Sequence, residues 1–243
     1  MKIISVSNER EMSLEAARII AALVRLKPKA ILGLASGSTP LGAYKELARM
    51  WAEEGLDFSG VETVNPDEYI GLEETHPQSY RMYMRRHFTD LVAIPPHKVH
   101  LPNGMATDIE QECQDYDKLF ESLGFPDLQL LGIGTNGHIA FNEPADFFTA
   151  QTHRVTLTED TIDSNQRFFD NRHEVPTEAI TVGMRGIMSS KRILLLACGK
   201  AKARAIAQTC RGPVTPRLPA SILQLHPDAT LIADREALSE LDL

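Results

Sequence analysis

A histidine stands in a glycine-rich loop straight after an apolar run, and a glutamate follows it five residues later. The stretch LLGIGTNGHIAFNEP contains Gly132, Gly134 and Gly137 ahead of His138, and Glu143 lies near its end. Glycines let a backbone turn sharply and approach a ligand. A carboxylate on one ring nitrogen of an imidazole fixes the tautomer and raises the basicity of the other nitrogen. The spacing therefore predicts a general base, His138, that is oriented by Glu143.

An asparagine, Asn136, stands two residues before His138, where acid/base chemistry with histidine more often uses a carboxylate. An amide can orient an imidazole or a sugar hydroxyl through hydrogen bonds. It adds no negative charge, so it gives His138 less electrostatic help in staying protonated than an aspartate would. We therefore expect the acidic limb of the pH–activity profile to lie at lower pH than in an aspartate-bearing protein.

Metal binding is the competing interpretation of this loop. No second histidine follows His138 at a distance of two or four residues, and His153 and His173 are isolated in the sequence. A zinc site needs three or four ligands that converge on one ion. We therefore expect no metal here.

Two carboxylates follow another apolar run, in the stretch VETVNPDEYIGL. Asp67 and Glu68 are flanked by Val64, Tyr69 and Ile70, which indicates partial burial. A partly desolvated carboxylate has a raised pKa and can serve as a general base. Because neighbours in sequence point in different directions, we expect one of the pair to do chemistry and the other to hold structure. The alternative is that both cap the next helix or face solvent.

A possible phosphate cradle follows a third apolar run, in the stretch ILGLASGSTPLGAYKEL. Pro40 fits the first position of a helix, and Thr39 could cap that helix. The backbone N–H groups and hydroxyls of Ser36, Gly37, Ser38 and Thr39 would then gather at a helix N-terminus, where anions bind. The spacing matches neither a P-loop nor a dinucleotide fingerprint, so no nucleotide is implied. The alternative is an ordinary strand-to-helix turn.

Cations that could complete an anion site follow later in the chain. Arg167 precedes two aromatic residues that could hold it, and Lys200 and Lys202 stand after another predicted strand. Arginine and lysine are the usual partners of phosphate. A cradle, a buried acid, an oriented histidine and two cations form the set that an aldose–ketose rearrangement of a phosphorylated sugar needs. One group moves the anomeric proton to open the ring, and another carries a proton between neighbouring carbons.

Short apolar runs alternate with helical patterns along the chain and must position these groups. Runs typical of strands are residues 2–6, 30–35, 61–65, 98–102, 128–134, 153–157, 179–183, 192–198 and 229–234. Helical periodicity is found over 13–26, 40–54, 79–91, 107–123 and 200–210. Apolar strands separated by helices predict an α/β fold: a mostly parallel sheet with helices on both faces, a Rossmann-like three-layer sandwich. Ligands bind at the carboxyl ends of such strands, where the candidate loops begin.

The least regular part of the chain is 144–182, which we interpret as a lid-like insertion. We expect a single domain over 1–243, because no repeat, low-complexity tract or long linker divides the sequence.

Composition excludes several classes of function. The chain has 243 residues, 43% of them hydrophobic, and a net charge of −8, which disfavours nucleic-acid binding. No apolar run approaches the roughly 20 residues that cross a bilayer, and we expect no signal peptide. Cys113, Cys198 and Cys210 form no C-x-x-C pair. They indicate reduced thiols in a cytoplasmic protein.

Five segments occur in order over essentially the whole chain: LGLASGSTPLGAYKEL, NPDEYIGL, GIGTNGHIAFNEP, DSNQRFFDN and PASILQLHPDATLIAD. Together they resemble the glucosamine-6-phosphate deaminase family, short form, within the glucosamine/galactosamine-6-phosphate isomerases. The resemblance implies conversion of glucosamine 6-phosphate to fructose 6-phosphate and ammonia, in amino sugar catabolism. It implies no redox cofactor and no required metal, so we expect no cofactor. The expected partner is a small amino sugar phosphate, with neither nucleic acid nor membrane.

The resemblance also assigns roles residue by residue. Asp67 matches the base that takes the C2 proton and returns it at C1, and His138 matches the ring-opening base. Glu143 matches the carboxylate that orients His138, and Asn136 occupies a position where many members have aspartate and short bacterial forms have asparagine. The matching phosphate contacts are Ser36, Gly37, Ser38, Thr39, Arg167 and Lys202.

Larger, hexameric members of the family carry an allosteric site for N-acetylglucosamine 6-phosphate, built from basic residues after the N-E-P motif and a longer C-terminal tail. Here the corresponding stretch, QTHRVTL, contains Arg154 as its one arginine or lysine, and the sequence ends at Leu243. We therefore expect an unregulated enzyme that is a monomer or a small homo-oligomer.

Other functions stay open at this point. Galactosamine-6-phosphate deaminase is one, because the sequence does not settle the C4 epimer. A sugar-phosphate sensor that binds without catalysis is another, although such a protein would not need Asp67, His138 and Glu143 together. The 6-phosphogluconolactonases lack the N-E-P acid, so Glu143 argues against them.

Overall fold

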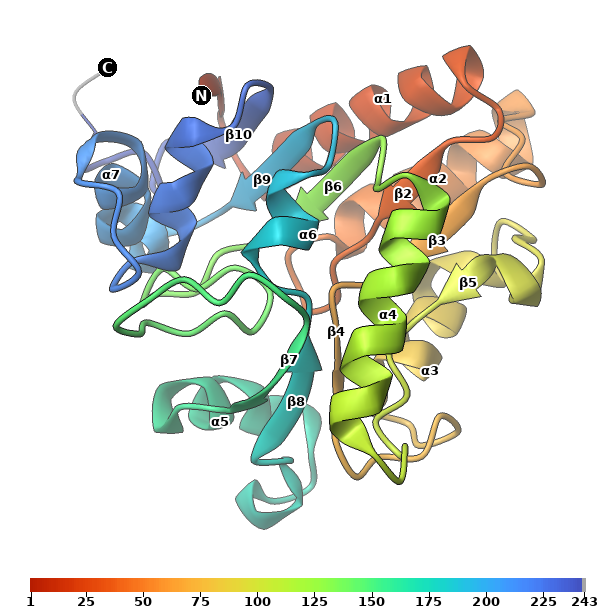
Figure 1. The fold of residues 1–243 in the computed structure, drawn as a ribbon. Helices are drawn as coiled ribbons and strands as arrows, with labels where there is room; N and C mark the ends of the chain where they lie inside the picture. Colours follow the sequence, from red (N-terminus) through yellow and green to blue (C-terminus); the bar gives the residue numbers. More distant parts are fainter. Residues whose placement is uncertain (242–243) are drawn as a thin grey trace.

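The structure is a computed structural model and describes residues 1–241. Its centre is a seven-stranded sheet whose strands run in the order β1-β10-β9-β6-β2-β3-β5, with every neighbouring pair parallel (Figure 1). These strands are β1 (Lys2–Val6), β2 (Ile31–Gly33), β3 (Glu62–Val64), β5 (Val99–His100), β6 (Leu128–Leu131), β9 (Ile193–Ala197) and β10 (Ala229–Asp234). The prediction of a mostly parallel sheet is confirmed.

Helices cover both faces of this sheet. They are α1 (Glu9–Leu26), α2 (Leu41–Glu54), α3 (Tyr80–Met84), α4 (Ile109–Leu123), α5 (Glu159–Asn165), α6 (Met184–Met188) and α7 (Ala203–Arg211). Alternate residues of one strand face opposite layers. In β9, Leu194 and Leu196 join the core beneath α1 and α2, whereas Ile193 and Leu195 join the core beneath α4, α6 and α7. The three-layer sandwich is therefore built on a continuous apolar strand.

The observed helices begin at other residues than predicted, and α1 and α2 show why. Helix α1 begins at Glu9, four residues earlier, because the Asn8 side chain accepts a hydrogen bond from the Glu11 N–H at 3.0 Å and caps it. Helix α2 begins at Leu41, with Pro40 at its N-cap position. Thr39 therefore does not cap α2, and its side chain is left to line a pocket.

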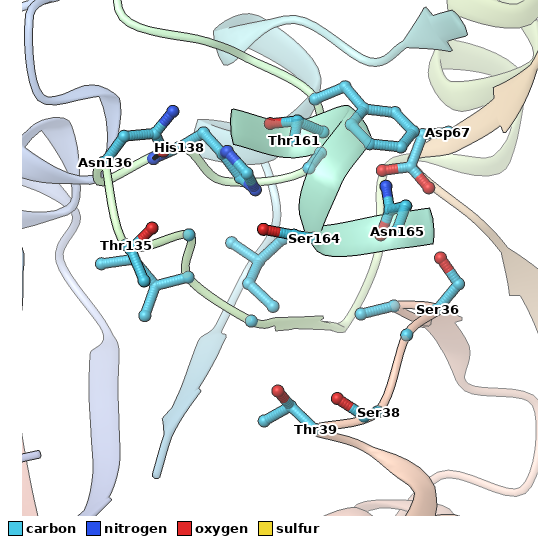
Figure 2. Close-up of a pocket in the computed structure, with 18 of the residues that line it drawn as sticks. Ser36, Ser38, Thr39, Asp67, Thr135, Asn136, His138, Thr161, Ser164 and Asn165 are labelled. Atoms are coloured by element: carbon cyan, nitrogen blue, oxygen red, sulfur yellow. Dashed lines mark hydrogen bonds between the residues drawn. The ribbon is translucent and has the colours of Figure 1, made fainter. Parts of the chain in front are cut away.

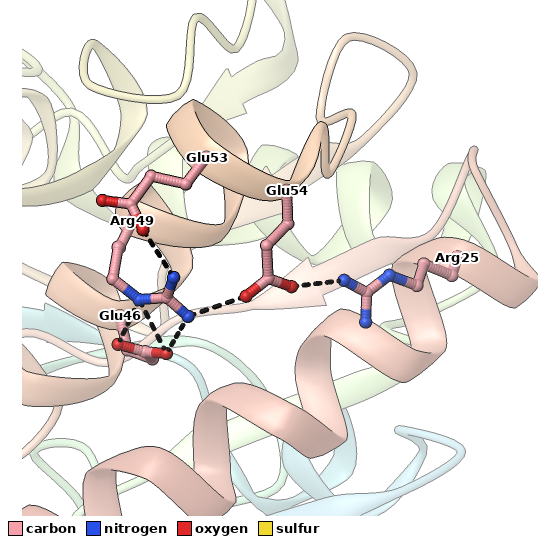
Figure 3. Close-up of polar contacts among 5 residues, drawn as sticks. All are labelled: Arg25, Glu46, Arg49, Glu53 and Glu54. Carbon is pink, nitrogen blue, oxygen red and sulfur yellow. Dashed lines mark hydrogen bonds and ion pairs between the residues drawn. The ribbon is translucent and has the colours of Figure 1, made fainter.

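Ion pairs join α1 and α2 at their surface. Arg49 of α2 donates to Glu46, Glu53 and Glu54, and Glu54 also accepts from Arg25 of α1 at 3.0 Å (Figure 3). Exposed pairs of this kind contribute little individually. The packing of α1 on α2 therefore depends mainly on the buried apolar side chains of the two helices.

A second, antiparallel sheet lies at the carboxyl edge of the main one. It has the order β4-β8-β7 and consists of β4 (Asp67–Tyr69), β8 (Glu178–Thr181) and β7 (His153–Thr156). The sequence predicts β7 and β8 as strands. It does not predict β4, which is short and carries two charges. Figure 1 shows this sheet below the main one, with α5 beside it.

The segment 144–182 thus contributes β7, α5 and β8. Its apolar side chains pack with Tyr69 and Phe141 in a small separate core that includes Leu157, Ile162 and Val175. Within residues 1–241, no helix is both long and apolar enough to cross a membrane.

Candidate active site

The predicted residues meet in one pocket at the carboxyl edge of the main sheet. The loops after β2, β3 and β6 form most of its wall, and α5 with the chain that follows it forms another part (Figure 2). Tyr80 and Lys202 complete it. The predicted residues that line it are Ser36, Gly37, Ser38, Thr39, Asp67, Asn136, His138, Arg167 and Lys202. Glu143 lies behind this wall, against His138.

The loop after β2 is held from behind by two tyrosines. The Tyr44 hydroxyl donates to the Ala35 carbonyl at 2.5 Å, and the Tyr83 hydroxyl donates to the Gly37 carbonyl at 2.5 Å. Gly37 has a φ of 88°, which an L side chain rarely adopts. Within residues 1–241, the backbone N–H groups of Gly37, Ser38 and Thr39 donate to no protein acceptor. These donors and the hydroxyls of the loop suit an anion.

Two cations lie at the same end of the pocket. Arg167 belongs to the 3-10 helix η3 (Gln166–Phe168), its Nη2 donates to Ser38 Oγ at 3.0 Å, and its guanidinium lies 4.7 Å from the centroid of the Phe168 ring. Lys202 is half-buried in η5 (Lys200–Lys202), and burial, together with the Arg167 charge, lowers the pKa of its amine. Lys200, the other candidate, is exposed and does not line the pocket. This end is therefore a cationic cradle.

Asp67 is the first residue of β4 and sits where the chain passes from the main sheet into the small one. Its side chain is buried, and Oδ1 has no hydrogen-bond partner among the residues that the structure describes. Burial, reinforced by the charge of Glu68, raises the pKa of Asp67 from 3.8 to about 8. A carboxylate that is desolvated in this way is a strong base once it is deprotonated.

Glu68 points away from Asp67 and holds backbone. Its Oε1 accepts from the N–H groups of Tyr69 and Tyr80, each at 2.9 Å, and its Oε2 accepts from the Arg81 N–H at 3.0 Å. Two of these donors are in the first turn of α3, so Glu68 ties β4 to that helix. Glu68 is thus the carboxylate of the pair that holds structure, and chemistry by Asp67 stays a prediction.

His138 and Glu143 are neighbours, and Asn136 links them. His138 Nδ1 lies 3.4 Å from Glu143 Oε2, without the alignment of a hydrogen bond. Asn136 donates from Nδ2 to the same oxygen at 2.7 Å and accepts from the His138 backbone N–H at 3.1 Å. The asparagine therefore positions both residues, and its N–H₂ group stabilises an ionised Glu143 where a second carboxylate would repel it.

The charge of Glu143 is favoured despite its burial. Burial is the largest single influence and raises its pKa, but the neighbouring His138, Thr161 and Asn136 together outweigh it and lower the pKa. Glu143 is therefore ionised at neutral pH.

The local geometry requires glycine at two of the three glycine positions of the loop after β6. A Cβ on Gly134 would lie 2.6 Å from the His138 ring, so the ring can pack there only over a glycine. Gly137 has a φ of 86° and would place a Cβ 2.2 Å from Leu218. Gly132 has neither constraint and lines the pocket opposite Thr39.

Sequence reasoning missed Thr161, which donates from its hydroxyl to Glu143 Oε1. It also missed three further lining residues, Tyr80, Ser164 and Asn165. Thr161, Ser164 and Asn165 all belong to α5, in the region interpreted as a lid. A threonine at helical spacing carries no signal of a partner 18 residues away.

Comparison with known proteins agrees with this geometry. The sequence profile of a family described as glucosamine-6-phosphate isomerases/6-phosphogluconolactonase matches residues 7–232. The chain belongs to this family.

Relatives within the glucosamine-6-phosphate isomerase family align along the full chain. A glucosamine-6-phosphate deaminase from Clostridium botulinum (strain Hall) is 50% identical over 243 residues, which cover 100% of each chain. Another from Thermoanaerobacter pseudethanolicus is 52% identical over 239 residues, which cover 98% of this chain and 94% of that one. The family resemblance inferred from the motifs is confirmed.

Solved structures share the architecture. A structure described as a monomeric glucosamine-6-phosphate deaminase superposes with a TM-score of 0.97 at 47% identity, covering 99% of this chain and 100% of that one. A 6-phosphogluconolactonase from Trypanosoma cruzi superposes with a TM-score of 0.78 at 18% identity, covering 100% and 97%. The second match shows a common fold alone.

Proposed function

We propose that this protein is a glucosamine-6-phosphate deaminase, which converts glucosamine 6-phosphate and water to fructose 6-phosphate and ammonia. The observation that carries the proposal is the buried carboxylate of Asp67, whose Oδ1 has no hydrogen-bond partner within residues 1–241, in the same pocket as the His138–Asn136–Glu143 cluster and opposite a cationic cradle. The full-length relatives of about half identical sequence support it.

Binding of the substrate begins with its phosphate at the cradle. The unpaired N–H groups of the loop 36–39, the Ser38 hydroxyl and the cations of Arg167 and Lys202 match a dianion in charge and in hydrogen bonding. Phosphate binding would also offset the repulsion between the two cations. The sugar ring then extends toward His138 and Asp67, which Figure 2 shows at a distance from Ser38 and Thr39.

Ring opening is the role we assign to His138. The imidazole takes the proton of the anomeric hydroxyl, and the ring oxygen is protonated as the C1–O5 bond breaks, which leaves an aldehyde at C1. Glu143, held ionised by Asn136 and Thr161, stabilises the imidazolium that forms.

Isomerisation is the role we assign to Asp67. Its carboxylate takes the proton from C2, and the electron pair forms a C1–C2 double bond as the aldehyde oxygen is protonated. The amino nitrogen gives up one proton to water, the proton held by Asp67 returns to C1, and the C2–nitrogen bond becomes an iminium. Water adds to C2, ammonia leaves, and the ketone of fructose 6-phosphate remains. Every atom is accounted for without a redox cofactor.

The raised pKa of Asp67 fits an amino sugar as substrate. An acid with a pKa of about 8 is mostly protonated in the empty pocket at neutral pH. The C2 ammonium of a bound amino sugar would place a positive charge beside it, which lowers the pKa and releases the base. The substrate thereby activates the residue that reacts with it.

We propose that the enzyme is monomeric, cytoplasmic and not activated by N-acetylglucosamine 6-phosphate. Arg154, the basic residue in the stretch after the N-E-P motif, donates from Nε and Nη2 to Glu178, so its guanidinium is already engaged. The three cysteines are free thiols, as in a reducing compartment. The similar deaminase structure is described as monomeric. Sedimentation of the purified protein at several concentrations tests the oligomeric state.

We also propose that 144–182 is a lid. Arg167 in this segment reaches Ser38 of the cradle, 129 residues earlier in the chain, and α5 forms part of the pocket wall. Hydrogen exchange over 159–168 should slow when substrate phosphate is bound, and unchanged exchange would argue against closure.

The decisive assay measures ammonia and fructose 6-phosphate released from glucosamine 6-phosphate, in parallel with galactosamine 6-phosphate. We expect equal amounts of both products and a clear preference for the glucosamine epimer, the substrate in the names of the relatives. Preference for galactosamine 6-phosphate would favour the alternative deaminase. Tight binding of either sugar with no ammonia released would indicate a sensor.

A further inference from the structure

The carboxylate of Glu143 is held from three directions. Oε2 accepts from Asn136 Nδ2 at 2.7 Å and lies 3.4 Å from His138 Nδ1, both in the loop after β6. Oε1 instead accepts from the hydroxyl of Thr161, on α5. One oxygen is therefore fixed by its own loop, and the other by a separate helix.

The Thr161 hydroxyl has one proton, and its neighbours direct that proton to Glu143. Thr158, the N-cap of α5, donates from Oγ1 to Thr161 Oγ1 at 3.1 Å. Thr161 is thus an acceptor toward Thr158 and a donor toward Glu143, which is the arrangement that a buried carboxylate needs. The chain Thr158–Thr161–Glu143 ends 3.4 Å from the imidazole.

We propose that Thr161 is a positioning residue for ring opening, which holds the Glu143 carboxylate against His138 and Asn136. The proposal rests on the proposed function, and it assigns to α5 a part in catalysis besides covering the pocket.

Helix packing alone does not account for this hydroxyl. The neighbouring Ile162 packs α5 onto the small sheet, in the apolar core with Leu157 and Val175. Thr161 is 3% exposed, and a buried hydroxyl is retained at such a site when it has a hydrogen bond to make. Valine has the same shape as threonine, so it would preserve packing and remove the hydroxyl, which donates to Glu143 and accepts from Thr158.

Loss of the donor changes the protonation of Glu143. A hydrogen bond to a carboxylate favours its charged form, so removal raises the pKa of Glu143 from its lowered value. His138 is the titratable group against this carboxylate, and Asp160 of α5 lines the same pocket. Within residues 1–241, Thr161 is the hydrogen-bond donor to Oε1 of Glu143.

The test compares Thr161→Val and Thr161→Ser with the wild type, by kcat/KM for glucosamine 6-phosphate from pH 5 to 8.5. The ratio of variant to wild type cancels the titration of Asp67, which is common to both. For Thr161→Val we expect KM within about threefold and kcat reduced about tenfold at pH 8, because the phosphate contacts are untouched. The ratio should fall a further severalfold, and at most about 30-fold, toward pH 5, because one hydrogen bond to a charged group is worth about one to two pKa units and the pKa of Glu143 starts below 4.5. Thr161→Ser, which keeps the donor, should restore the wild-type profile.

A matched control is Asp163→Asn on the same helix. Asp163 is exposed and pairs with Arg172 at the surface, so the substitution perturbs α5 without touching Glu143. The ratio of its kcat/KM to that of the wild type should not change with pH. A double-mutant cycle with Glu143→Gln should show that the Thr161→Val effect shrinks when the carboxylate is absent.

Different outcomes would overturn the proposed deaminase activity and the positioning role of Thr161. A wild-type protein that releases no ammonia overturns the proposed function. An active wild type with a pH-independent ratio for Thr161→Val, or a Thr161→Ser variant as impaired as the valine, overturns the positioning role.

Discussion

Asp67→Asn should abolish turnover and, at neutral pH, stabilise the fold. The side chain is buried, and its Oδ1 has no hydrogen-bond partner among the residues described. Its pKa is about 8 in the folded protein against an ordinary 3.8. A group whose folded pKa is raised contributes stability below its unfolded pKa and loses it as the pH rises toward the folded pKa. The wild type therefore loses stability from Asp67 between pH 4 and pH 8.

The magnitude follows from the gap between the two pKa values. At about 1.4 kcal/mol per pH unit, the four-unit gap gives a penalty of about 6 kcal/mol that is complete above pH 8. Asparagine avoids this penalty but buries amide donors, at a cost of about 1–3 kcal/mol at every pH. The variant should be less stable than the wild type at pH 4, equal between pH 5 and 6, and more stable by about 2–3 kcal/mol at pH 7.5. For a chain of this size, that corresponds to a rise in Tm of about 5–10 °C.

The assay is thermal unfolding of both proteins from pH 4 to 8.5, with turnover and substrate binding measured in parallel. Substrate binding should stay within a few fold of wild type, because the phosphate cradle is intact. Asp127→Asn is a control of opposite sign. Asp127 is buried, which alone raises its pKa, but Lys191, Lys27 and the Ile31 N–H together lower it. Its substitution should therefore destabilise most at neutral pH and least at pH 4.

Two results would refute the reasoning about Asp67. A stability difference between variant and wild type that does not change with pH would mean that the carboxylate is not held at a raised pKa. Near-normal turnover by Asp67→Asn would mean that Asp67 is not the base for the C2 proton.

His138→Gln should reduce kcat by about 10²–10⁴, the usual cost of a lost acid/base group, and the loss should shrink with open-chain substrate; an undiminished loss would contradict a ring-opening role. Asn136→Asp should move the acidic limb of the kcat/KM profile to higher pH, since the donor 2.7 Å from Glu143 becomes a second carboxyl; an unshifted profile would show that the amide is not what sets this limb. N-acetylglucosamine 6-phosphate should leave a hyperbolic saturation curve unchanged, because Arg154 is engaged by Glu178; activation, or a sigmoidal curve that it makes hyperbolic, would show regulation.

The fold was predictable from the sequence to a large extent, because its signals are local. Strands such as 193–197 and 229–234 are continuous apolar runs, and only a sheet covered on both faces buries such runs. The short strand β4 escaped prediction since the sequence DEY has no apolar alternation, and its partner β8 lies more than a hundred residues away. The small antiparallel sheet was therefore visible only as two separate strands.

The sequence by itself determined where chemistry could occur, because loops that follow parallel strands converge at one edge. Ser36, Asp67 and His138 were placed there by the order of strands and loops alone. The tertiary structure decided how these groups are held. It pairs Asn136 with Glu143 and brings Thr161 to the other carboxylate oxygen. Such contacts depend on the packing of α5 against the loop after β6, which no local periodicity encodes. Burial, too, is a property of the folded whole, and it is burial that raises the pKa of Asp67.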